Sequence, residues 1–436
     1  MRRTGFILFI LHLLLFTSSA QTWTMQQCMQ YAVEHNHEVK QAALELDNYK
    51  AQKTKAVGSF LPAVDAGIGA QYNFGRAIDP ETNGYTDVST FYNGYQLSAS
   101  LPVFDGFSRL HALRAAKASE LMGRASLRQH QDQTALNVLQ AYANVAYYEG
   151  LVKMAEEKVQ ETALLLKQTR LLEEVGRKSA ADVAQVESQQ AEADYELTRQ
   201  QNLYASAMLE LKKTMNYPLS DSIKVLGDGC WVMVDSNSQH PTSNTQHPEL
   251  QTARYHMQAS KHEWHQARAS LFPSLSLSAG LNTTYYKTLH SETTASFSNQ
   301  FKNNMGEYVG ATLSIPLFNR LQTVTNIRKA KNNYKIACEA YEQKQLELEE
   351  LSQVAWQDWQ GYLKQTVQME KKVEADSLAY QLTRRQFEEG LSTAIDLHTT
   401  GSQLLKSKAT LLQCRLMAMV KEQLVRYYKG EQIWTE

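Results

Sequence analysis

The sequence predicts a mainly α-helical protein with a transmembrane β portion, built from two repeats in which two strands precede a long helical hairpin. Three observations support this prediction. An export signal opens a chain of 436 residues that has no later apolar run of about 18 residues. Two proline-free tracts of helix-forming residues each follow a pair of alternating strand patterns. Matching features of the two halves recur at an offset of 214 residues, as in Pro102 and Pro316 (316 − 102).

The first 20 residues have the pattern of a secretory signal peptide. Arg2 and Arg3 precede the apolar run 6–16, and the small residues 18–20 supply a cleavage site before Gln21. The apolar run is too short for a spanning helix, and no cysteine stands at the new N-terminus to carry a lipid anchor. An amphipathic anchor is the alternative interpretation. We expect an exported protein without a transmembrane helix.

Composition excludes some function classes. A net charge of −1, with 20% charged residues, lacks the basic surface that nucleic-acid binding requires. The four cysteines show no CxxC or short pairing, so we expect packing residues and not a disulfide framework: Cys28, Cys230, Cys338 and Cys414.

Proline positions predict two unusually long helices. No proline occurs between Pro102 and Pro218 or after Pro316, and proline inside a helix costs about 3 kcal/mol. The composition is helical over 107–175 and 319–389. At 1.5 Å per residue, each helix would span about 100 Å.

Each long helix is predicted to turn back on itself. Gly176 and Gly390 are suited to end a helix, and Ser179 and Thr393 can cap the next one. Positions that are apolar except for Gln190 then step by seven in both return segments: Val183, Gln190, Leu197, Tyr204 and Leu211, and Leu397, Leu404, Leu411, Ala418 and Val425. A seven-residue step is typical of a coiled coil. We expect antiparallel coiled-coil hairpins, although the hairpins taken alone favour a soluble helical bundle.

Period-two alternation predicts four strands, at about 61–78, 88–104, 272–290 and 305–318. One face of each is apolar, the other is small and polar, and aromatic residues gather toward the loop ends. Strands that face lipid have this pattern, and so does a half-buried soluble sheet. Four strands cannot close a membrane barrel, so strands that span a membrane require several copies of the chain.

The chain therefore divides into a signal peptide (1–20) and two structural repeats. The first repeat (21–247) holds a helix, two strands, the hairpin 107–215 and a connector at 216–247, in which 230–234 is a candidate short strand. The second repeat (248–436) holds a helix, two strands, the hairpin 319–429 and a C-terminal segment.

With this organisation in place, the sequence resembles the TolC family of outer-membrane efflux proteins over nearly the whole mature chain. The specific motifs are "LPVF" (101–104) and "IPLF" (315–318), the helix opening "HPEL" (247–250), and the two glycine-to-aspartate turns. The stretch 72–83 is similar to the first extracellular hairpin of members from the Bacteroidota. The resemblance implies a TolC-like trimeric α/β barrel: four strands per protomer in a shared 12-stranded barrel, a periplasmic tunnel of hairpins, and an equatorial belt formed by the connector and the C-terminal segment.

The resemblance also implies a pore constriction at the tips. Asp396 matches an acidic ring position, Thr399 stands where the family has a second acidic residue, and Ser392 stands where it has a basic restraint. Asp182 occupies the duplicate tip. A three-fold ring of Asp396 would favour cations over anions. The alternative for either aspartate is a solvated helix-start residue favoured by the helix dipole.

Two further sets of site residues follow from the same resemblance. The tips would dock an adaptor through small residues that permit close approach: Gly176, Ser179, Ala180, Gly390, Thr393 and Ala394. The strand-to-helix corners would mark the junction of lipid and periplasm: Pro102, Phe104, Pro316 and Phe318. Plain helix termination is the alternative role for the glycines.

No catalytic constellation, HExxH motif or nucleotide-binding glycine loop occurs in the sequence, so we expect no enzyme, cofactor or metal. The expected function is a passive exit duct of a tripartite efflux or type I secretion system. It would be a homotrimer in the cell outer membrane with a large periplasmic portion. Its partners would be a periplasmic adaptor (membrane fusion protein), an inner-membrane RND or ABC pump, and outer-membrane lipid. A periplasmic coiled-coil scaffold or adaptor without a pore is the alternative. The sequence leaves the cargo and the pump class open.

Overall fold

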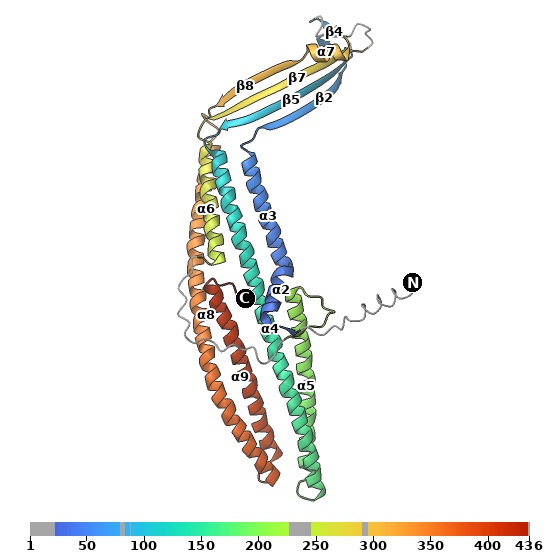
Figure 1. Ribbon diagram of the computed structural model, residues 1–436, viewed down its shortest axis with the longest axis vertical. Coiled ribbons are helices and arrows are strands. Elements are labelled where there is room, and N and C mark those ends of the chain that lie inside the picture. The colour runs from blue at the N-terminus through green and yellow to red at the C-terminus, as the bar shows by residue number, and fades with distance from the viewer. Residues whose placement is uncertain (1–21, 79–82, 88, 226–245, 290–294, 435–436) are drawn as a thin grey trace, which may run out of the picture. The chain divides into compact units, whose positions relative to one another are not determined.

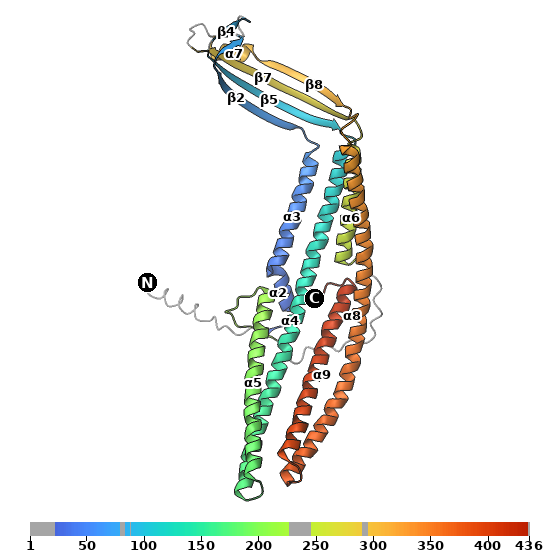
Figure 2. The ribbon, with the colours of Figure 1, turned by 180° about the vertical axis from the view of Figure 1, so that it is seen from behind.

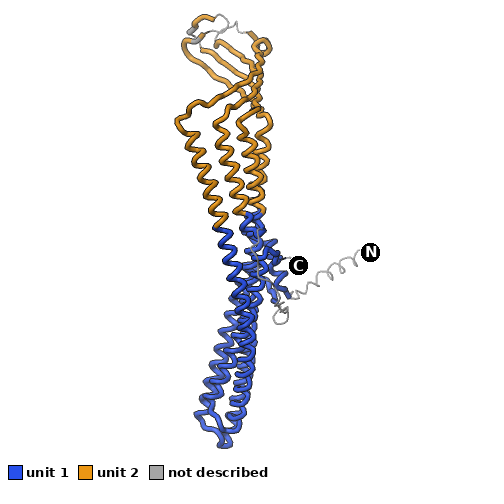
Figure 3. Tube along the Cα trace, turned by 90° about the vertical axis from the view of Figure 1, so that its left-hand side faces the viewer, with its two compact units in different colours: residues 1–44, 125–251, 343–436 blue, residues 45–124, 252–342 orange. Residues whose placement is uncertain are grey.

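The structure is a computed structural model that describes residues 22–78, 83–87, 89–225, 246–289 and 295–434. The predicted signal peptide, Cys230 and most of the predicted connector lie outside these residues. The chain divides into two compact units (Figure 3). The hairpin unit comprises residues 1–44, 125–251 and 343–436, and the sheet unit comprises residues 45–124 and 252–342.

The described elements repeat in order along the chain (Figure 1). Those of the first half are β1 (Thr22–Trp23), α2 (Met25–His35), α3 (His37–Gly58), β2 (Ala63–Asn73), β3 (Arg76–Ile78), β4 (Tyr85–Asp87), β5 (Thr90–Phe104), α4 (Ser108–Glu174) and α5 (Ala180–Met215). Those that follow are β6 (Lys224–Val225), α6 (Pro248–Ala269), β7 (Ser274–Thr288), α7 (Phe297–Asn303), β8 (Gly306–Ser314), α8 (Gln322–Glu389) and α9 (Ala394–Tyr428). The helices α4 and α8 have 67 and 68 residues, which confirms the two long helices.

The sheet unit contains one four-stranded antiparallel sheet with the order β2-β5-β7-β8, and the four strands lie side by side in both ribbon views (Figures 1 and 2). Its register brings the predicted apolar positions onto one face, because Val64 lies opposite Ala99, Ala99 opposite Ala279 and Ala279 opposite Val309. We call this face, which also carries Ile68, the apolar face.

The apolar face is exposed in the single chain. Ile68 is 75% exposed and Val309 is 86% exposed, and other large apolar residues of this face are exposed as well: Val64, Leu97, Leu277, Leu281 and Leu313. Within the described residues, β2 and β8 each pair with one strand only, so both edges of the sheet are open. A soluble sheet would have covered this face with core residues. The single chain therefore supplies no core for this face, which favours a cover of lipid over a half-buried soluble sheet.

At the end of the sheet that is remote from the helices, the strands differ from the predicted bounds. The segment predicted as one strand to residue 78 ends at Asn73, and β3 pairs separately with β4. The short helix α7 was not predicted. It lies beside β7, where β8 has not yet begun, and its apolar side chains contact the apolar face.

The first strand-to-helix corner is a tight turn inside the sheet unit. Pro102 lies within β5, next to a register shift between Pro102 and Phe104, and the chain then turns through Gly106 into α4. Gly106 has φ +68°, and a Cβ there would lie 2.5 Å from the carbonyl oxygen of Ala269 at the end of α6. The Asp105 carboxylate accepts hydrogen bonds from the Arg109 backbone N–H (3.1 Å) and Nε (2.8 Å), which fixes the start of α4.

The second corner has the same location in the repeat, but the strand before it ends earlier. β8 ends at Ser314, two residues before Pro316, and Arg320 and Leu321 both have positive φ. Phe318 is 78% exposed, whereas Phe104 packs edge-on against Phe107 with ring centroids 5.4 Å apart. Gly106 and Phe107 of the first corner also have positive φ (+68° and +71°), at positions 214 residues before Arg320 and Leu321. The two corners therefore share their position, sequence and backbone turn, and they differ in the length of the preceding strand and in the packing of the phenylalanine.

The main core of the hairpin unit lies at the end of the unit opposite the tips. Buried residues from α2, α4, α5 and the C-terminal segment pack together there, including Met29, Leu139, Leu211 and Ile433. β1 and β6 form a parallel two-stranded ribbon at this level. The indole Nε1 of Trp434 donates to the buried Asp132 carboxylate (2.9 Å), which attaches the C-terminal segment to α4.

The predicted heptads lie on the buried sides of the return helices. Val183 and Leu211 in α5, and Leu397, Leu404, Ala418 and Val425 in α9, are buried, while the positions between them are partly buried. None of the helices that the structure describes is long and apolar enough to cross a membrane.

Candidate functional site

Both hairpin tips are tight turns closed by hydrogen bonds of the backbone. Gly176 and Gly390 have φ +73° and +77°, a left-handed conformation that favours glycine, and nothing lies within 4 Å of a Cβ added to either. The backbone N–H of Arg177 donates to the Leu172 carbonyl (2.8 Å), and that of Leu391 donates to the Gln386 carbonyl (2.7 Å). Each glycine thus ends its helix as predicted.

A matching N-terminal cap starts each return helix. Ser179 and Thr393 are the N-cap residues, and each forms a reciprocal capping box with the aspartate three residues later, Asp182 or Asp396. The Asp396 Oδ2 accepts from the Thr393 backbone N–H (3.0 Å), the Thr393 hydroxyl (2.7 Å) and the Ser392 hydroxyl (3.2 Å). Asp182 has the same two partners in Ser179, at 3.0 and 2.8 Å.

These hydrogen bonds keep both carboxylates ionised. The pKa of Asp396 is lowered chiefly by the hydrogen bonds from the Thr393 side chain and backbone. The pKa of Asp182 is lowered chiefly by the backbone and side-chain hydrogen bonds from Ser179. All the hydrogen bonds described here reach Asp396 at Oδ2, and the side chain is exposed. The helix-cap role is therefore real for both aspartates, and it leaves negative charge at each tip.

The other predicted tip residues differ in exposure. Gly176, Ser179, Ala180, Gly390 and Thr393 are exposed, as the predicted docking role requires. Ala394, in contrast, is 3% exposed and belongs to an apolar cluster with Leu165, Val186, Phe387 and Leu397. Thr399 is exposed, and its hydroxyl donates to the Ile395 carbonyl of its own helix (2.9 Å).

The apolar cluster joins the first hairpin to the second just above the tips. Phe387, 1% exposed, comes from α8, and the Lys178 ammonium lies 3.9 Å from the centroid of its ring. The Gln189 side-chain amide of α5 donates to the Ala394 carbonyl of α9 (3.1 Å). His398 Nε2 of α9 lies 3.8 Å from the Glu192 carboxylate of α5.

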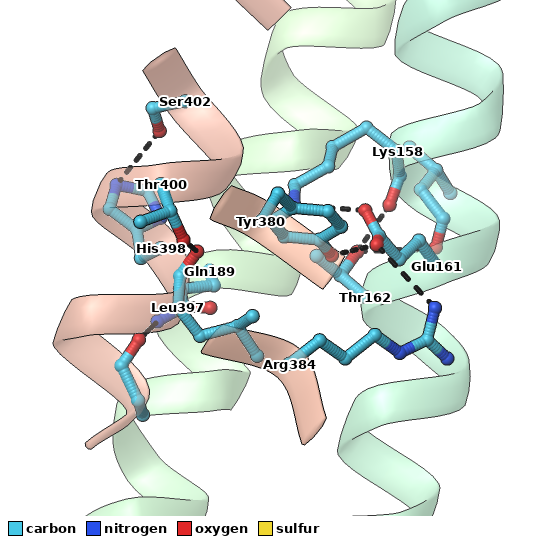
Figure 4. Close-up of polar contacts among 12 residues, drawn as sticks. Lys158, Glu161, Thr162, Gln189, Tyr380, Arg384, Leu397, His398, Thr400 and Ser402 are labelled. Atoms are coloured by element: carbon cyan, nitrogen blue, oxygen red, sulfur yellow. Dashed lines mark hydrogen bonds and ion pairs between the residues drawn. The ribbon is translucent and has the colours of Figure 1, made fainter. Parts of the chain in front are cut away.

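A polar cluster bridges the same two hairpins farther from the tips (Figure 4). The Tyr380 hydroxyl of α8 donates to the Glu161 carboxylate of α4, and the Arg384 guanidinium lies 3.9 Å from that carboxylate. Lys158 pairs with Glu161 (3.0 Å) and lies 5.7 Å from the Tyr380 ring centroid. We call Lys158, Glu161, Tyr380 and Arg384 the inter-hairpin cluster.

The inter-hairpin cluster lines a cavity of about 400 Å³ between α4, α8 and α9. Gly401 of α9 also lines it, and a Cβ at Gly401 would lie 3.1 Å from both the Lys158 ammonium and the Tyr380 ring. The close approach of these helices therefore depends on the small residue at this position.

Sequence reasoning did not identify the inter-hairpin cluster. The heptads fix how each return helix packs on its own long helix, but they do not fix how one hairpin aligns with the other. Among the described residues, no group of three or more His, Cys, Asp or Glu side chains is arranged to hold a metal ion.

Comparison with known proteins gives a consistent result for sequence and fold. The family model described as "Outer membrane efflux protein" matches residues 28–216 and 242–426. The chain is 24% identical over 418 residues to the probable efflux pump outer membrane protein TtgC of Pseudomonas putida, a match that covers 93% of this chain and 82% of TtgC.

Solved structures share the fold over almost the whole chain. A crystal structure of CusC matches with a TM-score of 0.80 at 17% identity, covering 94% of this chain and 92% of that one. The outer membrane protein VceC of Vibrio cholerae matches with a TM-score of 0.80 at 15% identity, covering 94% and 96% of the two chains.

Proposed function

The chain belongs to the outer membrane efflux protein family, and from this premise we propose that three copies form a passive exit duct for an efflux pump. The protein acts in the outer membrane, with its hairpins in the periplasm. The related TtgC is a probable efflux pump outer membrane protein. In our proposal a periplasmic adaptor and an energy-coupled inner-membrane pump complete the pathway, and this chain performs no chemistry of its own.

The exposed apolar face with its two open edges carries the proposal. A single chain cannot place this sheet in lipid, because the unpaired backbone groups of β2 and β8 would each cost several kcal/mol there, on the order expected for an unsatisfied polar group. Pairing β8 of one copy with β2 of the next removes both edges. Three copies then supply twelve strands, and the apolar face contacts lipid on the outside.

The tips are the proposed closed end of the duct. Three copies of Asp396 would meet around the three-fold axis, where like charges in a narrow passage favour cations. The exposed residues around Gly176 and Gly390 form the proposed adaptor contact.

The inter-hairpin cluster is the proposed restraint on opening. Opening the tip requires the two hairpins of one protomer to move relative to each other. That movement would break the Tyr380–Glu161 hydrogen bond and expose the cluster around Phe387.

Membrane fractionation tests the proposal. We expect the wild-type protein in the outer-membrane fraction as a trimer that dissociates on heating in detergent, and a strain lacking it should accumulate a dye pumped by its partner system. Recovery as a soluble periplasmic monomer would contradict the proposal and favour a scaffold without a pore.

A further inference from the structure

The short helix α7 forms a roof over part of the apolar face. Phe297 and Phe301 pack edge-on against Tyr95 of β5, with ring centroids 6.2 and 5.4 Å away. Phe297 also packs against Tyr285 of β7 (5.3 Å). Tyr95 and Tyr285 lie on the apolar face, because they are an even number of residues from Leu97 and Leu281 of the same strands.

Side-chain hydrogen bonds hold α7 in this place. The Gln300 amide binds both backbone groups of Tyr286, accepting from its N–H (2.9 Å) and donating to its carbonyl (2.8 Å). The Asn304 amide donates to the Thr284 carbonyl (2.9 Å), and the Thr283 hydroxyl donates to the Phe301 carbonyl (2.7 Å). These amides occupy the stretch of β7 that β8 leaves unpaired, so the roof is a fixed part of the sheet unit.

A groove of about 250 Å³ lies between the roof and the sheet. We call it the roofed groove, and its side chains on the apolar face and on the roof are mainly apolar: Ala66, Ile68, Tyr95, Leu97, Leu281, Thr283, Phe301 and Met305. Leu281 and Met305 are 42% and 48% exposed, so the groove opens to the surroundings of the apolar face.

The surroundings determine what can fill the groove. If the apolar face contacts lipid, as the proposed function requires, the groove opens into the bilayer. It lies at the end of the sheet remote from α6 and α8, which corresponds to the outer leaflet when those helices lie in the periplasm (Figure 1). An acyl chain is the apolar, unbranched group available there.

Two exposed lysines extend this site toward the membrane surface. Lys302 lies on α7 between the contacts made by Gln300 and Asn304, and hence level with Tyr285 on β7. Lys287 lies on the apolar face one step farther out, opposite Phe91. Among the described residues of the four strands, the carboxylate on this face is that of Glu307. It is level with Leu281, about 13 Å farther in than Tyr285 at 3.3 Å per residue. Positive charge therefore flanks the outer end of the groove.

We propose that the roofed groove holds an acyl chain of a phosphorylated glycolipid of the outer leaflet, whose phosphate contacts Lys302 and Lys287. This inference rests on the proposed function, because it requires the apolar face to lie in the outer membrane. It assigns α7 a role in fixing lipid at the outer rim of each protomer.

Lipid binding to the purified, delipidated trimer tests the inference, with lipid A as the probe and native mass spectrometry as the measurement. Reversing both charges in Lys287→Glu/Lys302→Glu should weaken lipid A binding at least about tenfold, since each lysine near an anionic headgroup contributes about fivefold. Leu281→Trp, which fills the groove without changing the charge, should also weaken lipid A binding.

Matched variants and a second lipid complete the experiment. Lys335→Glu on α8 and Val309→Trp, on the same face outside the groove lining, should bind lipid A as the wild type does. Unchanged binding in the test variants, an equal loss in the controls, or phosphatidylglycerol binding as tightly as lipid A would overturn the inference. Membrane fractionation of the same variants is a separate measurement. If trimers were absent from the outer membrane, the proposed function itself would be refuted, and not only the lipid site.

Discussion

In each tip aspartate, a single carboxylate oxygen accepts the capping hydrogen bonds, and the residue remains ionised because those bonds lower its pKa. Asp182 and Asp396 have the same role in their capping boxes, and Asp396 accepts one further hydrogen bond, from the Ser392 hydroxyl (3.2 Å). We expect the larger difference between them to arise from where each tip lies in the proposed trimer. Because of the duplication, a substitution at Asp182 can serve as the control for the same substitution at Asp396.

Replacing Asp396 by asparagine separates charge from capping. The side-chain oxygen of asparagine can still accept the hydrogen bonds from the N-cap residue Thr393, so the fold should persist. Removing three charges from the proposed ring should lower the cation-over-anion permeability ratio about two- to threefold, a modest effect because the site is exposed to solvent and salt. Reversal potentials in planar bilayers measure this ratio.

Asp182→Asn is the control for that measurement, and we expect its permeability ratio to match the wild type. An equal drop of the permeability ratio in both variants would contradict a constriction formed by the Asp396 tip alone. No drop in either would leave Asp396 with its helix-cap role alone.

The hairpins show, at the scale of elements, what a sequence reveals locally and what it does not. A glycine followed by Ser or Thr and then Asp three residues later specifies a turn and a cap within ten residues, and both tips form as predicted. The contact between Glu161 and Tyr380 joins residues 219 positions apart in the chain and has no local signature. Ala394 likewise looked like an exposed tip residue, but the neighbouring hairpin buries it.

Tyr380→Phe should loosen the link between the hairpins. The variant removes a hydrogen bond to a charged group, which contributes about 1.5–3 kcal/mol in typical cases, while keeping the ring that contacts Lys158. We expect a higher resting conductance of the purified channel and no loss of trimer. Tyr195→Phe, at a 68% exposed position of α5, should leave the conductance unchanged. A silent Tyr380→Phe would exclude the inter-hairpin cluster as a restraint.

At the scale of the whole molecule, the sequence predicted most of the architecture because the duplication shows each element twice. The alternation around Leu97 and Leu277 identified a face, and the register confirmed it across all four strands. The pattern could not decide between lipid and a protein core as the cover of that face. The exposure of Ile68 and Val309 shows that the folded chain itself supplies no core over that face. The roof at 297–303 was missed because its polar sequence is stabilised by β7 and not by its own helix propensity.

Arginine substitutions on the two faces of β5 test how the assembled molecule meets the membrane. Leu97 lies on the apolar face and Ser98 on the other. Leu97→Arg should reduce trimers in the outer membrane strongly, because arginine facing lipid near the middle of the bilayer costs about 2–4 kcal/mol per copy. Ser98→Arg should assemble nearly as well as the wild type. Equal yields of the two variants on heat-modifiability gels would contradict a lipid-facing role for this surface.

The open edges of β2 and β8 also matter before assembly, while the chain travels through the periplasm. A newly exported monomer carries two unpaired strand edges beside a broad apolar surface, a combination that invites aggregation. The amides of Gln300 and Asn304 already cover the outer stretch of β7, so β8 is the shorter strand left exposed on that side. We therefore expect the monomer to require a periplasmic chaperone before it assembles. On the β8 side, the unpaired edge that needs protection is shorter than β7.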